Sequence, residues 1–277
     1  MNITSIINNE FVEPLEVLLY SLSETQRDNI NFYLIYYNLQ EHELNRLKKF
    51  CTAININFFS IKFPDNIYKK LLQLKPQYVD NRFYPLEVYF RLFLPSLLPS
   101  FIRKVLYLDA DTYIQKNLRL FYDVNLDNLF FSAVLDPVVY EKNLISLKQE
   151  FFQRINVPED FLFVNTGVLL MNLENLRRTE RFTETQILEI IKNNLELNDQ
   201  DIINKYFHDM IFILFNVNFN RNPELEGPSL SEAYILHYMQ RKPWNDEITL
   251  DYSFYSMASF KWLQIRQKVD SLNKVLM

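Results

Sequence analysis

The sequence predicts an α/β fold in which a mainly parallel sheet is flanked by helices. Short apolar runs alternate with helical patterns through residues 3–61, and this order is typical of parallel strands joined by right-handed crossovers. Residues 105–108 form an unbroken apolar run, as a strand buried on both faces requires. The 48% apolar content is that of a folded globular chain.

The first part of the chain alternates strongly between strand and helix signals. A helix is expected from about Pro14, because leucines recur there at helical spacing and proline suits a first turn. A second helix is expected at about 40–50. Residues 64–84 are expected to be irregular and to lie over a cleft. The expected strands are 3–7, 31–37 and 54–61.

The remaining elements follow the same logic. A helix is expected at 86–95, stopped by Pro95, before the strand that ends at Asp109. Residues 161–172 read as a strand pair or a bent strand, and Gly167 inside it indicates a bulge or a close approach to the backbone. Further strands are expected at 130–135, 212–219 and 234–238, and further helices at 183–194, from about 197, and at 253–277.

Composition excludes several classes of protein. A net charge of −5 and a pI near 5.4 argue against a nucleic-acid-binding protein. Gly167 and Gly227 are the only glycines, so neither a Walker loop nor a G-x-G-x-x-G turn can be written. Cys51 is the only cysteine, which excludes an intrachain disulfide and favours a reducing compartment. No signal peptide or membrane span is recognisable, so a cytoplasmic protein is expected.

Asp109 and Asp111 follow the apolar run directly, and strand alternation would point both side chains the same way. Two such carboxylates repel each other and need a cation, a shared proton or open water. A hard divalent metal that also carries phosphates is one interpretation, and a solvated turn is the other. Taken singly, His237 would be an ordinary histidine, Asp199 a helix N-terminal acid, and Arg91 an arginine paired with a surface carboxylate.

Taken together, several motifs resemble glycosyltransferase family 8 over roughly residues 3–245. No single motif carries the resemblance, but their order and combination are specific. The motifs are Asn8-Asn9-Glu10-Phe11, Tyr89-Phe90-Arg91-Leu92, Leu106-Tyr107-Leu108-Asp109-Ala110-Asp111, Asp136, Asn165-Thr166-Gly167-Val168-Leu169-Leu170-Met171-Asn172, Asp199-Gln200-Asp201, and His237 with Lys242-Pro243-Trp244.

The resemblance implies a GT-A fold and transfer of glucose or galactose from a UDP-sugar with retention of configuration. It implies manganese, with magnesium as the alternative, held by Asp109, Asp111 and His237, and it places Ala110 beside the nucleotide sugar. The metal would neutralise charge on the UDP leaving group. Lys242 would add a cation at the same phosphates.

The resemblance also assigns the sugar and base ends of the donor. Catalytic roles fall to Gln200, Asp199 and Asp136, with Gln200 beside the anomeric carbon. Because an amide oxygen is a poor nucleophile, attack from the front face is preferred to a covalent intermediate. The residues expected to hold sugar hydroxyls are Arg91, Asp136, Asn165 and Asp199, and those expected at the uracil are Asn8, Asn9 and Phe11.

Two departures from the family pattern affect these expectations. Asn8 and Asn9 stand where aspartate is common, although an asparagine carbonyl still accepts a hydrogen bond from uracil. The last motif, His237 with Lys242-Pro243-Trp244, has one residue fewer between His237 and Lys242 than is usual in the family, and it lacks the family glycine. The backbone must therefore approach the phosphates differently.

Two other functions remain open on sequence grounds. A haloacid-dehalogenase-like phosphatase would use Asp109 as nucleophile, but it leaves His237 and Asp199 unexplained. A non-catalytic carbohydrate-binding protein on the same fold is the second alternative.

The expected division is a GT-A domain at 1–250 and a helical tail at 251–277. The acceptor is expected to be a glycan, a lipo-oligosaccharide or a glycoprotein. Aromatic and basic residues of the tail indicate either a packed helix or peripheral contact with the inner face of a membrane. These residues are Phe260, Trp262, Arg266, Lys268 and Lys274.

Overall fold

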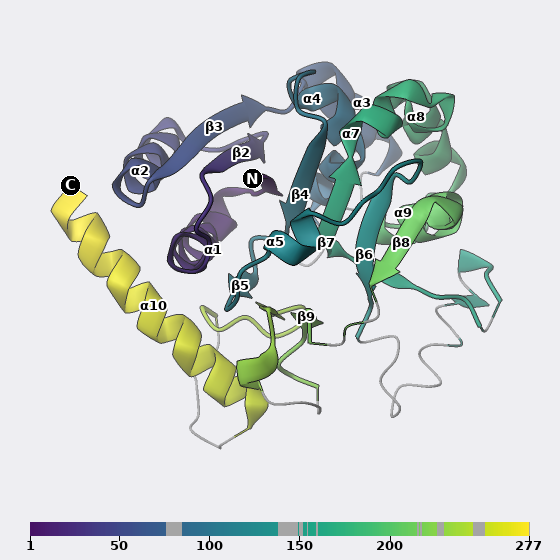
Figure 1. Ribbon diagram of the computed structural model, residues 1–277. Helices are drawn as coiled ribbons and strands as arrows, with labels where there is room; N and C mark the ends of the chain where they lie inside the picture. The colour runs from purple at the N-terminus through teal and green to yellow at the C-terminus, as the bar shows by residue number, and fades with distance from the viewer. Residues whose placement is uncertain are drawn as a thin grey trace.

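Figure 1 shows the computed structural model of the chain. It describes residues 1–75, 85–137, 149, 152–153, 155–158, 160–214, 216, 218–225, 230–245 and 253–276. The strands are β1 (Asn2–Ile6), β2 (Ile30–Tyr36), β3 (Ile56–Lys62), β4 (Lys104–Leu108), β5 (Thr112–Ile114), β6 (Phe131–Leu135), β7 (Val164–Asn172), β8 (Ile211–Leu214), β9 (Asn220–Arg221) and β10 (Ile235–His237). The α-helices are α1 (Val12–Thr25), α2 (Glu41–Ala53), α3 (Asp65–Leu74), α4 (Leu94–Leu97), α5 (Arg119–Tyr122), α7 (Leu173–Arg178), α8 (Glu184–Asn193), α9 (Asp199–Phe207) and α10 (Phe254–Leu276). The 3₁₀ helices are η1 (Asn9–Phe11), η3 (Leu86–Phe93), η5 (Glu180–Phe182), η6 (His208–Met210) and η7 (Leu230–Glu232).

The main sheet confirms the predicted α/β class. Within the described residues its strand order is β3-β2-β1-β4-β7-β6-β8. Strands β3, β2, β1 and β4 run parallel, and β8 runs parallel to β6. Only β7 is antiparallel to its neighbours. The predicted alternation of strands and helices through residue 61 is therefore confirmed, with end points shifted by a few residues.

Helices cover both faces of this sheet, as Figure 1 shows. Along β2, Phe32 and Leu34 pack on the face covered by α1, α2 and α10. Tyr33 and Ile35 pack on the opposite face, which η3, α3 and α7 to α9 cover. The alternation follows from the two-residue period of a strand. Both faces of β4 are buried as well, so the prediction of a strand buried on both faces is confirmed.

A second, three-stranded sheet has the order β5-β10-β9. Strand β5, which sequence analysis missed, begins directly after the Asp109–Asp111 turn. It pairs antiparallel with β10, and His237 lies opposite Thr112. This pairing brings a histidine from late in the chain beside the two aspartates.

Two predictions about helices are wrong in part. Residues 65–74 form α3 instead of irregular chain, because Ile67 and Leu71 lie four residues apart and both are buried. Residues 76–84 of the predicted cleft segment lie outside the described part. The segment 86–95 is not one helix stopped by proline. It is a 3₁₀ helix followed by α4, and Pro95 lies in the first turn of α4, where no donor is needed.

One strand prediction changes and another is narrowed. The expected strand 212–219 ends at Leu214, and Phe219 lies in a turn before β9. Of the two alternatives predicted for residues 161–172, the structure has the single strand, over residues 164–172. Its pairing with β6 jumps from Leu169 to Asn165 between consecutive β6 residues, which confirms the predicted irregularity around Gly167.

The terminal helix α10 packs against α1 and α2. Trp262 is buried in their shared core, and Arg266 forms ion pairs with Glu13, Glu16 and Asp270. Trp262 and Arg266 are thus engaged inside the protein instead of at a membrane surface. Among the described helices, none has the length and apolar character needed to cross a bilayer.

Candidate functional site

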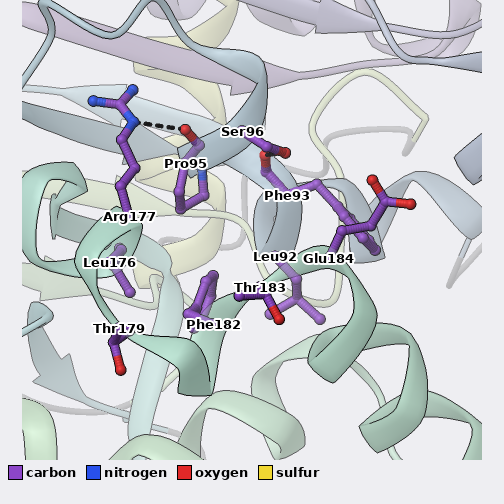
Figure 2. Close-up of a pocket in the computed structure, with 10 residues that line it drawn as sticks. All are labelled: Leu92, Phe93, Pro95, Ser96, Leu176, Arg177, Thr179, Phe182, Thr183 and Glu184. Carbon is purple, nitrogen blue, oxygen red and sulfur yellow. Dashed lines mark hydrogen bonds between the residues drawn. The ribbon is translucent and has the colours of Figure 1, made fainter.

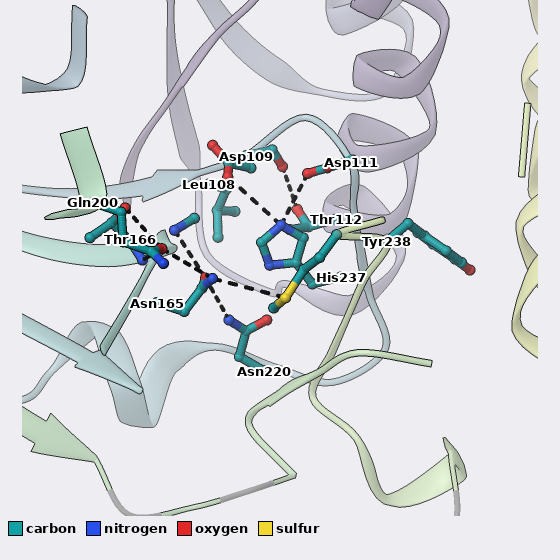
Figure 3. Close-up of polar contacts among 12 residues, drawn as sticks. Leu108, Asp109, Asp111, Thr112, Asn165, Thr166, Gln200, Asn220, His237 and Tyr238 are labelled. Carbon is teal, nitrogen blue, oxygen red and sulfur yellow. Dashed lines mark hydrogen bonds and ion pairs between the residues drawn. The ribbon is translucent and has the colours of Figure 1, made fainter. Parts of the chain in front are cut away.

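The two aspartates and the histidine converge where the two sheets meet (Figure 3). Strand β4 ends at Leu108, and the backbone N–H of Thr112 donates to the carbonyl of Asp109 at 3.2 Å. This turn directs both carboxylates toward β10. Nε2 of His237 lies 3.1 Å from Oδ1 of Asp111 and 3.7 Å from Oδ2 of Asp109. One ligand atom from each of the three residues lies within 4.8 Å of the others.

Gly167 of β7 makes this convergence sterically feasible. A Cβ added to it would press against Oδ2 of Asp109 and Cε1 of His237, closer than real Cβ atoms approach. Its carbonyl also accepts a 2.7 Å hydrogen bond from the backbone N–H of Asp109. The prediction of a close approach at Gly167 is confirmed, and the groups that approach are two of the proposed metal ligands.

Asp109 is held through one of its carboxylate oxygens only. The Tyr107 hydroxyl donates to Oδ1 at 2.5 Å, and Nη2 of Arg91 donates to the same atom at 3.0 Å. Oδ2 faces His237. The protein therefore anchors one oxygen and leaves the other directed at the three-residue cluster.

Arg91 links Asp109 to the start of α9. Its Nη1 donates to the Thr166 carbonyl at 2.8 Å, and its Nε lies 2.8 Å from Oδ2 of Asp199. The guanidinium also lies 4.4 Å from the centre of the Tyr107 ring. Burial opposes its charge, but the nearby carboxylates raise the pKa of Arg91 above its usual value. The surface-carboxylate interpretation is wrong, because both acceptors belong to the site.

Asp111 has a second cationic neighbour. Nζ of Lys242 lies 2.5 Å from Oδ2 of Asp111 and also donates to the carbonyls of Tyr238 and Met239. Burial disfavours the Asp111 carboxylate, but Lys242 and His237 outweigh it and hold its pKa well below the usual range. Asp111 is therefore ionised at neutral pH. The shortened motif between His237 and Lys242 still brings Lys242 to Asp111, and its contact with a phosphate stays a prediction.

Three polar side chains form a second cluster beside the first, at the end of the β6–β7 pair. Nδ2 of Asn165 donates to Oδ2 of Asp136 at 3.2 Å, and Nε2 of Gln200 donates to the same oxygen at 3.0 Å. The backbone N–H of Thr166 donates to Oε1 of Gln200 at 2.9 Å. Asp136, Asn165 and Gln200, three residues assigned to the sugar, therefore lie together.

Asp199 is the first residue of α9, whose N-cap is Asn198. Asn198 and Asp201 form a reciprocal capping box, which fixes the first turn and so the direction of Asp199 and Gln200. Burial raises the pKa of Asp199 to about 6, although Arg91 acts in the opposite direction. Asp199 is thus more than an ordinary helix N-terminal acid, because it forms a buried ion pair.

The predicted base-binding residues occupy the loop after β1. Oδ1 of Asn8 caps η1 through the N–H of Glu10 at 3.0 Å, and Nδ2 of Asn9 donates to the carbonyl of Asn38 at 2.9 Å. Phe11 meets Trp244 edge to face at 5.9 Å. Trp244, the last residue of the motif Lys242-Pro243-Trp244, therefore contacts the loop after β1. Contact with uracil stays a prediction.

Several residues of the site were missed from the sequence. Tyr107 gave no signal inside its apolar run, because its hydroxyl reaches Asp109 only through the fold. Thr166 contacts Arg91 and Gln200 through both its backbone and its hydroxyl, and no sequence pattern reveals these contacts. Asn220 belongs to a two-residue strand, and its Nδ2 donates to Oδ1 of Asn165 at 3.0 Å.

A separate cavity of about 160 Å³ lies between η3–α4 and α7–α8 (Figure 2). It contains none of the predicted site residues. The Arg177 guanidinium at its edge is occupied by backbone carbonyls, among them those of Pro95 and Ile102 at 2.7 Å. We assign this cavity no part in the site.

The comparison with known families decides the identity of the chain. The sequence profile described as Glycosyl transferase family 8 matches residues 2–248. The chain belongs to glycosyltransferase family 8. This membership accounts for the D-x-D turn, His237 and the Asp199–Gln200 pair together, which the phosphatase alternative does not.

Curated relatives include glycosyltransferases of several bacteria. Glycosyltransferase GlyB of Streptococcus pneumoniae is 24% identical over 98% of this chain and 66% of its own length. A putative glycosyltransferase of Haemophilus influenzae is 22% identical over 74% of this chain and 58% of its own. A lipopolysaccharide 1,2-glucosyltransferase of Escherichia coli is 24% identical over 88% of this chain and 73% of its own length. The chain spans less than two thirds of the length of the first two relatives.

Solved structures confirm the GT-A-like fold of this family 8 chain. The galactosyltransferase LgtC, solved with donor and acceptor sugar analogues, has a TM-score of 0.75 and 22% identity, covering 97% of this chain and 96% of LgtC. Glycosyltransferase GlyE of S. pneumoniae has a TM-score of 0.65 and 17% identity, covering 96% of this chain and 63% of GlyE. The fold therefore extends through almost all of the sequence.

Proposed function

We propose that the protein is a retaining hexosyltransferase that moves glucose or galactose from a UDP-sugar to a glycan or glycoconjugate acceptor, with manganese as its metal and magnesium as the alternative. The observation that carries the proposal is the pairing of two adjoining clusters. One contains Asp109, Asp111 and His237. The other contains Asp136, Asn165 and Gln200. A diphosphate and a sugar require such neighbouring sites.

The donor atoms of the first cluster fit a hard divalent cation. Two carboxylate oxygens and an imidazole nitrogen suit manganese, and the neighbouring Lys242 and His237 keep the pKa of Asp111 below its usual range, so that its carboxylate is charged. Gly167 leaves room between Asp109 and His237. The metal, when bound, would hold the two donor phosphates and offset the negative charge that develops on UDP.

Lys242 would exchange its present partner for a donor phosphate. Its ammonium already neutralises Asp111 at 2.5 Å, so it occupies space beside the proposed metal ligands. Asp109, Asp111 and His237 would hold a cation that neutralises Asp111, and Lys242 would then contact a donor phosphate. The position of Trp244, whose ring centre lies 5.9 Å from Nζ of Lys242, would keep the side chain near the same end of the donor.

The second cluster supplies acceptors and donors for sugar hydroxyls. The Asp136 carboxylate receives hydrogen bonds from two amides, so its orientation is fixed before a ligand arrives. Asp199 is fixed by Arg91. Hydrogen-bonding groups fixed in this way select one epimer over another, because the wrong hydroxyl leaves a buried polar group unpaired.

Gln200 supports front-face attack over a covalent intermediate. Both ends of its amide are bound, Nε2 to Asp136 and Oε1 to the Thr166 N–H, and an amide oxygen is a poor nucleophile. We propose that Gln200 orients Asp136 and lines the sugar. Recovery of a glycosyl adduct on Gln200 or Asp199 by mass spectrometry would contradict this mechanism.

A thermal-shift assay tests the function directly. UDP with manganese should raise the melting temperature of the protein more than either does alone, because a ligand that binds only the folded state stabilises it. Asp111→Ala should lose this joint shift. Absence of a joint shift in the unmodified protein would leave the non-catalytic alternative standing.

A panel of UDP-sugars then identifies the donor. We expect UDP release with UDP-glucose or UDP-galactose, first to water and then faster with an added glycan acceptor. Alanine at Asp109 or Asp111 should abolish transfer. Manganese-dependent transfer by Asp111→Ala would show that the proposed ligand set is wrong.

A further inference from the structure

Asn220 is a buried polar residue next to the sugar end of the site (Figure 3). It belongs to β9 and lies opposite Ile235 of β10, so the small sheet that carries His237 also carries this side chain. Asn220 is 1% exposed. Its backbone pairs with β10, so the side-chain amide takes no part in holding the sheet together and can bind a residue of the site.

The side-chain amide of Asn220 controls the orientation of Asn165. Nδ2 of Asn220 donates to Oδ1 of Asn165 at 3.0 Å, and the backbone N–H of Gly167 donates to the same oxygen at 3.0 Å. Two donors on the oxygen side leave Nδ2 of Asn165 facing Asp136 at 3.2 Å and Gln200 at 3.3 Å. A reversed Asn165 amide would set its oxygen against the Asp136 carboxylate.

A packing role does not explain Asn220. Its own Oδ1 is buried and has no hydrogen-bond partner among the described residues. A buried polar atom without a partner is costly, whereas an apolar residue of similar size would avoid the cost. Such a group calls for an explanation, and the hydrogen bond from its amide to Asn165 supplies one.

We propose that Asn220 is a positioning residue for glycosyl transfer. It holds the Asn165 amide in the orientation that fixes Asp136 and Gln200 against the donor sugar. This inference rests on the proposed function, because the sugar is the ligand that the three side chains are arranged to meet.

Asn220→Asp is the sharpest test, since it keeps the shape of the side chain and removes the donor. At pH 8 the new carboxylate would face Oδ1 of Asn165 and repel it. We expect a fall in kcat of roughly 30-fold, in the range that small misplacements cause, with the affinities for UDP and for manganese within about threefold of those of the unmodified protein.

The pH profile separates positioning from a structural effect. A protonated aspartic acid can again donate to Asn165, and a buried carboxyl next to an oxygen has a raised pKa. The kcat of Asn220→Asp should therefore recover as pH falls from 8 toward 5, relative to the unmodified protein. Charged or titratable groups of the described elements around this position are Arg221 on β9, His237 on β10, Asp136 after β6, and Asp199 and Asp201 on α9, whose Gln200 contacts Asn165.

Asn222→Asp is the matched control. Asn222 is equally buried on the same segment, and its Oδ1 accepts from the backbone N–H of Glu224 at 3.0 Å, which aspartate can still do. Asn222→Asp therefore introduces a buried carboxylate, as Asn220→Asp does, at a residue that forms no hydrogen bond with Asn165. UDP release to water by this variant should match that of the unmodified protein at every pH.

A binding measurement makes the outcome independent of turnover. A UDP-sugar fluorinated at C2, which resists transfer, is titrated beside UDP in the presence of manganese. Asn220→Asp should bind UDP normally and lose the additional affinity that the sugar provides. Unchanged kcat and sugar affinity in Asn220→Asp, or an equal loss in Asn222→Asp, would overturn the inference while the proposed function stands. If the unmodified protein binds neither UDP nor the fluorinated donor, both proposals fail.

Discussion

Gly167 is the residue on which the metal cluster depends most. It separates Asp109 from His237, and a side chain there would meet both. Gly167→Ala should therefore displace one or both proposed ligands, and we expect manganese affinity to fall roughly 10–100-fold, as when groups that orient metal ligands are changed. Isothermal titration of manganese in the presence of UDP measures this directly.

Val168→Ala provides the control for the Gly167 substitution. Val168 is fully buried on the same strand and pairs with Leu108. Its truncation should lower the free energy of unfolding by about 1–3 kcal/mol and leave manganese affinity unchanged. Equal manganese affinity in Gly167→Ala and the unmodified protein would contradict the steric argument.

Asp199 gives the site a titratable group near neutral pH. Burial raises its pKa from 3.8 to about 6 despite the opposing effect of Arg91. Between about pH 4 and 6 the folded state binds more protons here than the unfolded chain, so this group lowers stability as pH rises. If the carboxylate holds a sugar hydroxyl, kcat should fall as pH drops below about 6.

The variant Asp199→Asn tests this acid limb. It should have a low kcat that no longer depends on pH between 5 and 7. Asp209→Asn is the control, because Asp209 is exposed and pairs with Arg181 outside the site. If kcat of Asp199→Asn still falls below about pH 6 as in the unmodified protein, the titration belongs to another group.

At the level of residues, sequence and resemblance singled out the proposed metal ligands but not the side chains that hold them in place. Asp109 and Asp111 were visible because two carboxylates after a buried strand require an explanation. The hydrogen bonds from Tyr107 and Arg91 to Asp109 were not predicted, because a tyrosine inside an apolar run is normally expected to be a core residue. The contact of Lys242 with Asp111 depends on the path of a short loop, which the sequence pattern does not determine.

Among the secondary-structure elements, the loop between α8 and α9 determines where Asp199 and Gln200 lie. Nζ of Lys75 is buried there and donates to the carbonyls of Leu195 at 2.7 Å and Leu197 at 2.8 Å. The Tyr89 hydroxyl donates to the Leu197 carbonyl at 2.7 Å. The end of α3 and the η3 segment thus jointly hold the residues that precede the N-cap of α9.

Replacing Lys75 should loosen this loop. Lys75→Met leaves at least one buried carbonyl without a donor, so we expect a loss of about 2–4 kcal/mol in unfolding free energy and a lower kcat. Lys69→Met, at an exposed position of the same helix, should change neither. Chemical denaturation and UDP release measure the two effects, and a loss of stability without loss of kcat would contradict a link to α9.

The protonation of Lys75 adds a pH signature to that test. Burial lowers its pKa from 10.5 to about 8, although Glu196 and Asp201 oppose the shift. Between about pH 8 and 10.5 the unfolded chain therefore binds more protons than the folded protein, and this group adds stability as pH rises. The difference in unfolding free energy between the unmodified protein and Lys75→Met should grow across that interval.

The elements that sequence predicted well are those with long, regular patterns. The strands and helices through residue 61 and the helices predicted at 183–194 and 253–277 fall into this class. Strands β5, β9 and β10 have two or three residues each, and only β10 was expected. Such short strands exist because of their partners, so no local period reveals them. They nevertheless place His237 and Asn220, which explains why the site was harder to predict than the sheet.

Over the whole molecule, helices cover a hydrophobic cluster on each face of the main sheet, and α10 completes the layer that contains α1 and α2. Glu16 of α1 is buried and binds Arg46 of α2 at 2.7 Å and Arg266 of α10 at 3.2 Å. Nδ2 of Asn273 donates to the same carboxylate at 3.1 Å. This buried network joins the first and last helices, and its members depend on one another for charge compensation.

The position of Trp262 allows the expected division between residues 1–250 and a tail at 251–277 to be tested. Its ring is buried and lies 5.4 Å from the ring of Trp244, and Trp244 in turn contacts Phe11. A tail that folds independently would make no such chain of contacts to the loop after β1. We therefore expect α10 to unfold together with the rest of the protein.

Trp262→Ala and Phe260→Ala form the matched pair for this prediction. The buried tryptophan should cost about 3–5 kcal/mol of unfolding free energy, and the whole protein should melt in one transition at a lower temperature. Phe260 is 48% exposed on the same helix, so its truncation should cost less than about 1 kcal/mol. The UDP-induced thermal shift should also fall in Trp262→Ala, because Trp262 supports Trp244 beside Phe11. Two separate calorimetric transitions in the unmodified protein would instead establish the tail as its own unit.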